Sequence, residues 1–375
     1  MSWKLRAGSR CMRGAQWPMA RAASMARDGT ADPERLDSRA RPCAILPRMT
    51  GYVRPALAAA AALAGLLLQA VPSFARDNAG EAVDAYAFTQ DYEPAPALWE
   101  LSDEDTTIYM FGTIHMLPEG FRWRNPQLDA IIDTADALVL ETSDADSVED
   151  FAAMGEKFAT IMAARTPTSE RLSPEARGKW RQLAARTGMP FDYIDSMPLM
   201  LVLMDFGLGR TQPNPSSYEN GVETVLEREF LESERPVGSI EDSGHVLYGL
   251  MRIDDAEAVA DLDRALRRWS GKRVDSLYGD DADDAGGDGY WQMEHDWARG
   301  RVGEDFDLGF GSGKIAAAFH DVLLNRRNTR WAAWLENRLE QPGTILLAVG
   351  AGHFEGSDSL LEKLRERGLR ARRIN

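Results

Sequence analysis

Cysteine is nearly absent from this sequence of 375 residues, which contains only Cys11 and Cys43. Both lie within residues 1–48, a stretch that is rich in arginine and shows no regular spacing of apolar residues. Without that stretch, the chain can form no disulfide, no thiolate metal site and no cysteine nucleophile. We therefore expect the folded part to depend for its stability on its hydrophobic core.

Positive charge is also scarce. The chain has 43 lysine and arginine residues against 59 aspartate and glutamate residues, which gives a net charge of -16. An excess of negative charge repels a phosphate backbone, so we expect no nucleic-acid partner. Histidine is rare as well, with five residues, and 44% of the chain is hydrophobic, which is typical of a globular protein with a full core.

The longest apolar run lies near the front of the chain. It extends from Pro55 to Leu68, directly after Arg54, and is shorter than the about 20 residues that a membrane-spanning helix needs. Small residues then occupy the -3 and -1 positions of Ser73-Phe-Ala75, before Arg76. We interpret residues 49–75 as a signal peptide. This predicts a periplasmic or secreted protein with no stable membrane span after cleavage.

The position of this signal peptide bears on the true start of the protein. A signal peptide normally begins at the start codon, so we interpret Met49 as the start and residues 1–48 as an over-extended leader. The alternative is a long, basic, disordered leader. Residues 76–95 are polar with scattered proline and glycine, which predicts a linker before a domain at 96–375.

Strand and helix patterns alternate after residue 96. Apolar and β-branched runs predict strands at 98–101, 106–111, 137–140, 236–240, 344–349 and 370–374. Helical spacing predicts helices at 125–135, 147–208, 218–234, 243–269, 290–300, 314–339 and 357–367. Asn125 suits the N-cap of the first helix and Pro126 its first position. We therefore expect an α/β fold: a central, mostly parallel or mixed sheet flanked by helices, with a large helical middle region.

Polar side chains lie just past the ends of four of these strands: His115, Glu141, Glu241 and His353. The two histidines each end a G-x-x-H sequence, Gly112–His115 and Gly350–His353, in which glycine lets the backbone turn sharply. Ligand crevices of α/β sheets lie at the carboxyl ends of the strands. If the strands run parallel in one sheet, all four side chains gather at that edge.

Two kinds of chemistry are compatible with this group. Two neutral imidazoles and one or two carboxylates are a normal ligand set for zinc, manganese, cobalt or iron, and an open position on the metal activates water. The same residues without metal can form a His/Glu acid–base pair. A single histidine after a strand is more often an ordinary loop residue, so the recurrence of the G-x-x-H sequence carries the argument for a site.

These motifs resemble the TraB/GumN family, whose relatives include the Tiki proteases. The resembling segments follow in order: Leu98-Trp99, Tyr109–His115, Leu138–Glu141, Gly221-Val222-Glu223, Gly238–Glu241, Asn325–Asn328 and Val349–His353. They cover about residues 97–375. The sequence departs from the family at Glu223, where Asp is usual, and at Phe354, where Leu is usual. We expect neither departure to touch the site.

The resemblance implies an α/β fold akin to the erythromycin-esterase and ChaN-like proteins. It also implies divalent-metal chemistry, since Tiki members are metal-dependent proteases. Transferred to this sequence, His115 and His353 are expected to bind manganese, cobalt or zinc, with Glu141 as third ligand or as base for a bound water.

The resemblance assigns three further roles. Arg327 is expected to stabilise a developing oxyanion and Asn328 to orient substrate, although both can instead cap and pair within their helix. Glu241 is expected to support the site from behind by holding the tautomer of a histidine.

Three functions remain open at this stage. The first is an exported, divalent-metal-dependent hydrolase of peptide or amide bonds, similar to a metalloprotease. The second is a ligand-binding or polysaccharide-assembly factor without turnover, because GumN occurs among polysaccharide biosynthesis genes. The third is a metal-free esterase-like hydrolase that uses His and Glu. The substrate, a peptide or a small molecule, is not specified by the residues.

Overall fold

The computed structural model describes residues 86–375, apart from 208–214, 254–255, 279–286, 305–309 and 311. The predicted leader at 1–48, the signal peptide at 49–75 and the first part of the linker lie outside the described residues. Among the helices that are described, none is long and apolar enough to cross a membrane.

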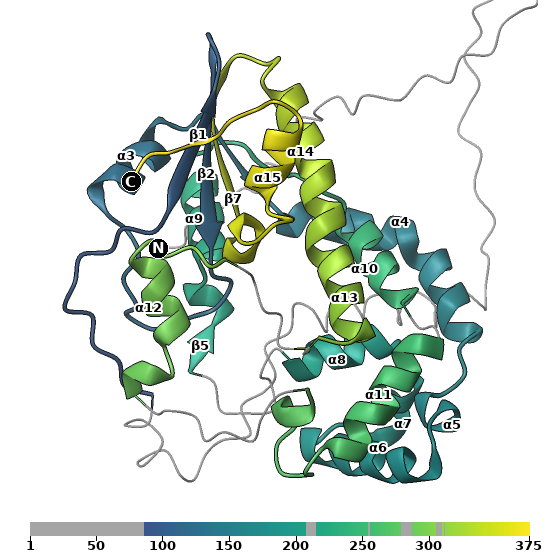
Figure 1. Ribbon diagram of the computed structural model, residues 1–375. Helices are drawn as coiled ribbons and strands as arrows, with labels where there is room; N and C mark the ends of the chain where they lie inside the picture. Colours follow the sequence, from purple (N-terminus) through teal and green to yellow (C-terminus); the bar gives the residue numbers. More distant parts are fainter. Residues whose placement is uncertain (1–85, 208–214, 254–255, 279–286, 305–309, 311) are drawn as a thin grey trace, which may run out of the picture. The chain divides into compact units, whose positions relative to one another are not determined.

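The fold contains a six-stranded sheet with the strand order β6-β4-β7-β2-β1-β8, of which Figure 1 labels β1, β2 and β7. Its strands are β1 (Leu98–Ser102), β2 (Thr106–Thr113), β4 (Ala137–Leu140), β6 (Val237–Ser239), β7 (Gly343–Gly350) and β8 (Arg372–Arg373). The first four in the sheet order are parallel, and β1 and β8 add an antiparallel edge. A second sheet pairs β3 (Leu117–Pro118) with β5 (Ser216–Ser217). The predicted α/β fold with a mostly parallel sheet is confirmed.

Strand β7 shows why the sheet needs helices on both faces. Its side chains alternate, so that Ile345, Leu347 and Val349 enter one hydrophobic core while Leu346 and Ala348 enter the other. All five are buried. A strand that is buried on both faces reads as a continuous apolar run, which is the pattern the sequence has here.

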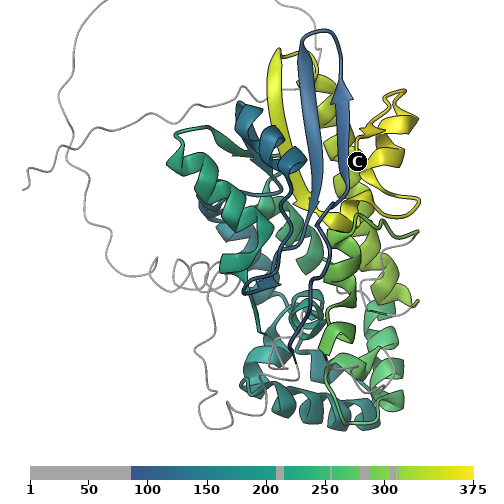
Figure 2. The ribbon, with the colours of Figure 1, turned by 90° about the vertical axis from the view of Figure 1, so that its left-hand side faces the viewer.

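Two pairs of helices cover the faces of the sheet. Helices α3 (Pro126–Thr134) and α9 (Val222–Glu232) pack on one face, and α14 (Arg326–Arg338) and α15 (Leu360–Glu366) pack on the other (Figure 2). The predicted start of α3 is confirmed, because the Asn125 side chain accepts a hydrogen bond from the backbone of Leu128 and proline opens the helix.

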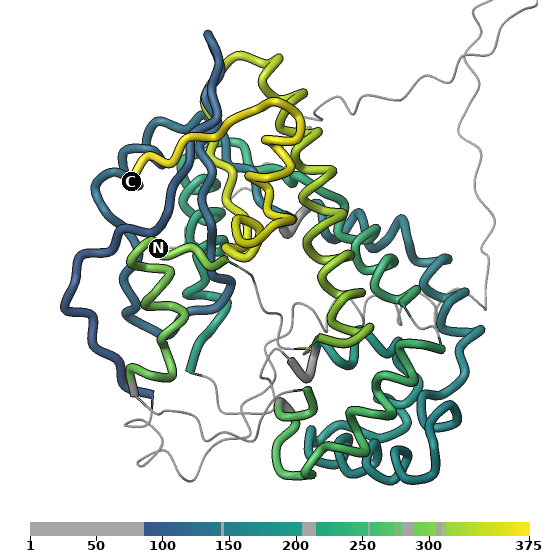
Figure 3. The backbone as a smooth tube through the Cα atoms, viewed as in Figure 1, coloured from purple at the N-terminus to yellow at the C-terminus, as the bar shows by residue number. Residues whose placement is uncertain are grey.

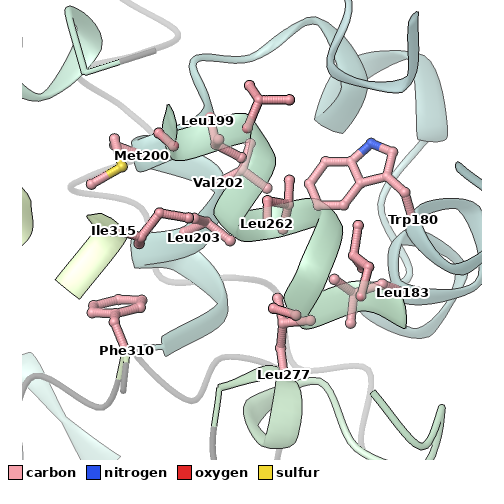
Figure 4. Close-up of a cluster of buried hydrophobic side chains, with 14 of the residues drawn as sticks. Trp180, Leu183, Leu199, Met200, Val202, Leu203, Leu262, Leu277, Phe310 and Ile315 are labelled. Atoms are coloured by element: carbon pink, nitrogen blue, oxygen red, sulfur yellow. The ribbon is translucent and has the colours of Figure 1, made fainter. Parts of the chain in front are cut away.

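The helical middle region has its own core (Figure 4). Its helices are α4 (Asp144–Ala163), α5 (Thr168–Arg171), α6 (Pro174–Thr187), α7 (Phe191–Ser196), α8 (Leu199–Gly207), α10 (Ser243–Met251), α11 (Ala256–Arg268) and α13 (Lys314–His320). The continuous helical pattern predicted for 147–208 is divided into five helices. Each of the last four begins at a proline or directly after one, at Pro167, Pro174, Pro190 and Pro198. Proline has no backbone N–H to donate, so it interrupts the preceding helix.

The helix predicted at 314–339 is also interrupted. A π-helical turn at Asp321–Asn325 separates α13 from α14, although the chain continues as one coil (Figure 3). Ile315 of α13 packs in the core of the middle region, whereas Trp331 of α14 packs against the sheet. Turns of this kind are frequent at functional sites, and Arg327 is the second residue after this one.

Residues 86–95, within the predicted linker, form no helix or strand but pack on the body of the fold. Phe88 and Tyr92 lie against the core of the sheet, beside α12 (Gln292–Ala298). The backbone N–H of Ala95 donates to the carbonyl of Ala298 at 2.7 Å. The aromatic side chains explain why this part of the stretch packs on the fold. The polar composition of residues 76–95 as a whole had predicted a linker.

Candidate functional site

The two G-x-x-H turns leave the sheet side by side. Strands β2 and β7 are parallel neighbours, and their register pairs Thr113 with Gly350, so both turns begin at the same level. A Cβ atom on Gly350 would lie 3.0 Å from Oε1 of Glu141 and 3.4 Å from Nε2 of His115. A side chain at this position would crowd both groups, so glycine eases this approach, which brings residues from three strands together. We call His115, Glu141 and His353 the sheet-edge centre.

Glu141 is held at both carboxylate oxygens. Its Oε1 accepts the backbone N–H of Gly350 at 2.7 Å, and its Oε2 forms an ion pair with Arg327. Nε2 of His353 lies 3.6 Å from Oε1, which is too long for a hydrogen bond. Burial acts to raise the pKa of Glu141, but Arg327 and the two histidines outweigh it and keep the pKa far below its ordinary value. The side chain is therefore a fixed negative charge.

Arg327 lies between two carboxylates. Its Nε donates to both oxygens of Glu241, at 2.9 and 3.0 Å, while its Nη2 reaches Glu141. Its Nη1 donates to the carbonyl of Leu323 in the π turn at 3.0 Å, and its plane lies over the ring of Trp331. The guanidinium thus faces its own carboxylates, which leaves little of it for the predicted oxyanion contact.

Glu241 does not have the role that was expected of it. Its oxygens accept hydrogen bonds from Arg327 and from Nε1 of Trp331, at 3.0 Å for the latter, and within the described part of the chain it forms no hydrogen bond or ion pair with a histidine. Burial raises its pKa, and Arg327 opposes this. Glu241 supports the site by holding Arg327 rather than by holding a histidine tautomer.

Asn328 holds the histidine of the second turn. Its Nδ2 donates to the carbonyl of Asp358 at 2.8 Å, which turns its Oδ1 toward Nδ1 of His353 at 2.6 Å. An amide oxygen only accepts, so Nδ1 of His353 carries the proton and Nε2 keeps its lone pair. Asn328 is 1% exposed. It therefore orients His353, whereas the resemblance implied that it orients substrate.

His353 is buried and neutral. Its side chain is 5% exposed and its ring lies 4.2 Å, centroid to centroid, from that of Trp331. Burial, helped by the charge of Arg327, lowers the pKa of His353 to about 3. Near neutral pH the ring therefore presents an uncharged nitrogen, Nε2, to Glu141.

His115 has the opposite environment. Its side chain is 58% exposed, and its Nδ1 lies 2.7 Å from Oε1 of Glu223. Thr113 donates its hydroxyl to the same oxygen. The negative charge of Glu223 raises the pKa of His115 to about 9, although desolvation opposes it. The exposed ring therefore holds a proton on each nitrogen near neutral pH.

The expectation that Glu223 lies away from the site was wrong. Glu223 is in the first turn of α9, and Gly221, directly before that helix, packs against the backbone of His115. The sequence carried a signal for this, since Gly221-Val222-Glu223 combines a glycine with a carboxylate at a helix start. The other departure, Phe354, stacks on Trp99 at 4.5 Å and lies beside Gly112, where it supports the backbone of both turns.

The chemistry of the donors suits a divalent metal better than their present spacing does. Both imidazoles have Nδ1 occupied by an acceptor, which is how metal-binding histidines are usually oriented, and Oε1 of Glu141 lies 3.6 Å from Nε2 of His353. Within the described residues, however, no three side chains of His, Cys, Asp or Glu form a group that could hold a metal ion. The donor types fit, and closure around an ion requires the side chains to move.

Comparison with known proteins identifies the chain at the level of a family. Residues 97–373 match the TraB/PrgY/gumN family. A search of curated proteins and a search of solved structures each returned no match.

Proposed function

The chain belongs to the TraB/PrgY/gumN family, and we propose that it is a hydrolase of peptide or amide bonds that works at the sheet-edge centre with a divalent metal. One observation carries the proposal. Two paired parallel strands end in G-x-x-H turns that set an exposed histidine and a buried, neutral histidine beside one ionised carboxylate. Groups with opposed environments at the carboxyl edge of a sheet are typical of catalytic sites.

Manganese, cobalt or zinc would be held by His115, His353 and Glu141. When bound, such an ion supplies a Lewis acid and an activated water. The surrounding charge favours a cation, because three carboxylates lie around the centre, while Arg327 pairs with two of them, Glu141 and Glu241. Hydrolysis would take place outside the cell membrane if the signal peptide at residues 49–75 is used.

The residues of the centre divide the work according to their environments. Both oxygens of Glu141 already accept hydrogen bonds, so it serves as a fixed charge rather than as a mobile base. His353 is oriented by Asn328 and stays neutral. His115 is the exposed member, so its Nε2 is the atom that is open to an incoming metal.

A metal-free hydrolase is the second candidate, and the pair of His115 and Glu223 favours it. An exposed imidazole whose Nδ1 is held by a carboxylate is the arrangement of a general acid–base pair. Arg327 and Glu241 would then serve only to keep Glu141 in place. In this case activity persists in strong chelator. A binding protein without turnover would show neither activity.

Metal content and cleavage together test these functions. Protein purified without chelator is analysed for metal, titrated with manganese, cobalt and zinc, and assayed on a peptide library. We expect uptake of about one equivalent and cleavage that disappears in the variants His115→Ala and His353→Ala. Uptake below about a tenth of an equivalent excludes the metal-dependent hydrolase, and cleavage that survives both substitutions excludes the sheet-edge centre.

A matched control is available in His245. This exposed histidine also has Nδ1 beside a carboxylate, Oδ2 of Asp242 at 2.5 Å, and it contacts no residue of the sheet-edge centre. His245→Ala removes a comparable side chain, so it should leave cleavage and metal uptake unchanged. Equal losses in His245→Ala and His115→Ala would indicate a general effect of the substitution.

A further inference from the structure

Glu223 is the carboxylate that makes the environment of His115. Its Oε1 lies 2.7 Å from Nδ1 of His115 and also accepts the hydroxyl of Thr113, which is buried in β2. Glu223 itself is 17% exposed, so water competes poorly for this contact. A hydrogen bond between an imidazole N–H and a shielded carboxylate is among the stronger ones in proteins.

The start of α9 is fixed against the turn that carries His115. The backbone N–H of Val222 donates to the carbonyl of Ile114 at 3.0 Å. A Cβ atom on Gly221 would lie 2.0 Å from the carbonyl oxygen of His115, so only glycine allows this approach. From the other side, Nε1 of Trp297 donates to the carbonyl of Gly112 at 2.7 Å. Glu223 and His115 therefore belong to two backbone segments that cannot easily separate.

The charge of Glu223 is directed at His115. The other two carboxylates near the centre, Glu141 and Glu241, share Arg327. Across the residues that the structure describes, no lysine or arginine pairs with Glu223, and its Oε2 is buried without a hydrogen-bond partner. A carboxylate held this way acts on its one ionisable neighbour rather than on a network.

We propose that Glu223 is the positioning residue for His115: it accepts the Nδ1–H, fixes the plane of the ring and keeps Nε2 turned toward Glu141 and Gly350. Glu223 thereby does for the exposed histidine what Asn328 does for the buried one. The functional use of this orientation rests on the proposed function, because a fixed Nε2 matters only if that atom binds a metal or exchanges a proton. The orientation itself is independent of any activity.

The position of the ring proton tests this directly. Protein labelled with ¹⁵N in its five histidines is studied by NMR without metal at about pH 10, where His115 is neutral, and His115→Gln identifies the signal. We expect Nδ1–H in the wild type and in Glu223→Gln, whose amide oxygen still accepts. In Glu223→Leu the proton should be shared between the nitrogens. An unchanged Nδ1–H signal in Glu223→Leu overturns the proposal.

Metal titration adds a second readout. Glu223→Leu should weaken metal binding by about 10- to 100-fold, the usual effect of removing the partner of a ligating histidine. Glu229→Leu is the matched control, since Glu229 lies on the same helix and pairs with Arg124 instead. If Glu223→Leu binds metal as tightly as the control, Glu223 does not position His115. If the wild type takes up no metal, the metal-dependent function is excluded. The NMR result still decides whether Glu223 positions His115.

Discussion

The two G-x-x-H turns have the same sequence pattern and the same place in the sheet, but opposite surroundings. The ring of His115 is largely exposed and has a carboxylate behind it, whereas that of His353 is buried and has an amide behind it. The repeated motif fixes only the backbone. Each neighbour, Glu223 or Asn328, decides what its histidine does, because the first stabilises an added proton and the second does not.

The difference also indicates separate roles: the turn that carries His353 contributes to stability, and the turn that carries His115 contributes to reactivity. The second turn is tied to α14 directly through Asn328, which meets His353. It is also tied through Glu141, which accepts the N–H of Gly350 and pairs with the buried Arg327. The first turn is open on the side of His115. We therefore expect substitutions around His353 to affect folding, and those around His115 to affect mainly binding and proton transfer.

The largest effect is expected from Arg327→Met. The substitution leaves Glu141 and Glu241 buried without their cation, and breaking a buried ion pair in this way costs about 3–5 kcal/mol. Urea unfolding at neutral pH measures the loss. Arg124→Met is the control, because Arg124 pairs with Asp129 and Glu229 in a half-exposed position, where about 1 kcal/mol or less is expected. If the two variants lose a similar free energy of unfolding, the buried ion pairs of Arg327 do not contribute more to stability than the half-exposed ones of Arg124.

The next effect separates the two partners of the histidines. Asn328→Leu leaves the Nδ1–H of His353 buried and unpaired, which should lower the free energy of unfolding by about 1–3 kcal/mol. Glu223→Leu should cost less, because water can reach the exposed ring of His115. Asn337→Leu, at an exposed position of α14, controls for the substitution itself. If Glu223→Leu proves the more costly change, the assignment of stability to the second turn is wrong.

A third prediction concerns the pH dependence of metal binding. Below the pKa of about 9 that Glu223 gives His115, a metal must displace a proton from Nε2. The affinity should therefore rise by up to about tenfold per pH unit between pH 6 and 8. Calorimetric titration at three pH values measures the slope. His115→Gln should flatten it, whereas an unchanged slope in that variant would assign the displaced proton to another group.

A fourth prediction concerns opposite slopes of stability with pH in the metal-free protein. The folded-state pKa of His353 is depressed, so the unfolded chain binds more protons and stability falls as pH drops from about 6.5 to about 3. The folded-state pKa of His115 is raised, so its contribution is complete below about 6.5 and is lost as pH rises through about 9. Unfolding midpoints measured across pH should lose the acidic slope in His353→Gln and the alkaline slope in His115→Gln.

Local patterns in the sequence predicted much of this molecule. The cap at Asn125, the apolar alternation of β7 and the paired G-x-x-H turns are properties of neighbouring residues, and each is found where it was predicted. Parallel pairing then brings the four polar residues to one edge, which follows from the topology of an α/β sheet.

The partners of these residues could not be predicted in the same way. That Glu223 meets His115, and that Asn328 turns toward His353, depends on how α9 and α14 pack on the sheet. Sequence spacing contains no information on such contacts between distant segments. The π turn before Arg327 was missed for a similar reason, because its residues have ordinary helical character.

The position of β7 has a consequence for how the protein is made. This strand lies between β4 and β2, although it is synthesised long after both of them. Until β7 is in place, neither β4 nor β2 has its main pairing partner. His115 then lies at the end of a strand whose parallel neighbour is still missing. Long-range pairings of this kind form slowly. The site therefore forms only when the whole domain has folded. A chain that ends before Gly343 lacks both the middle strand of the sheet and His353.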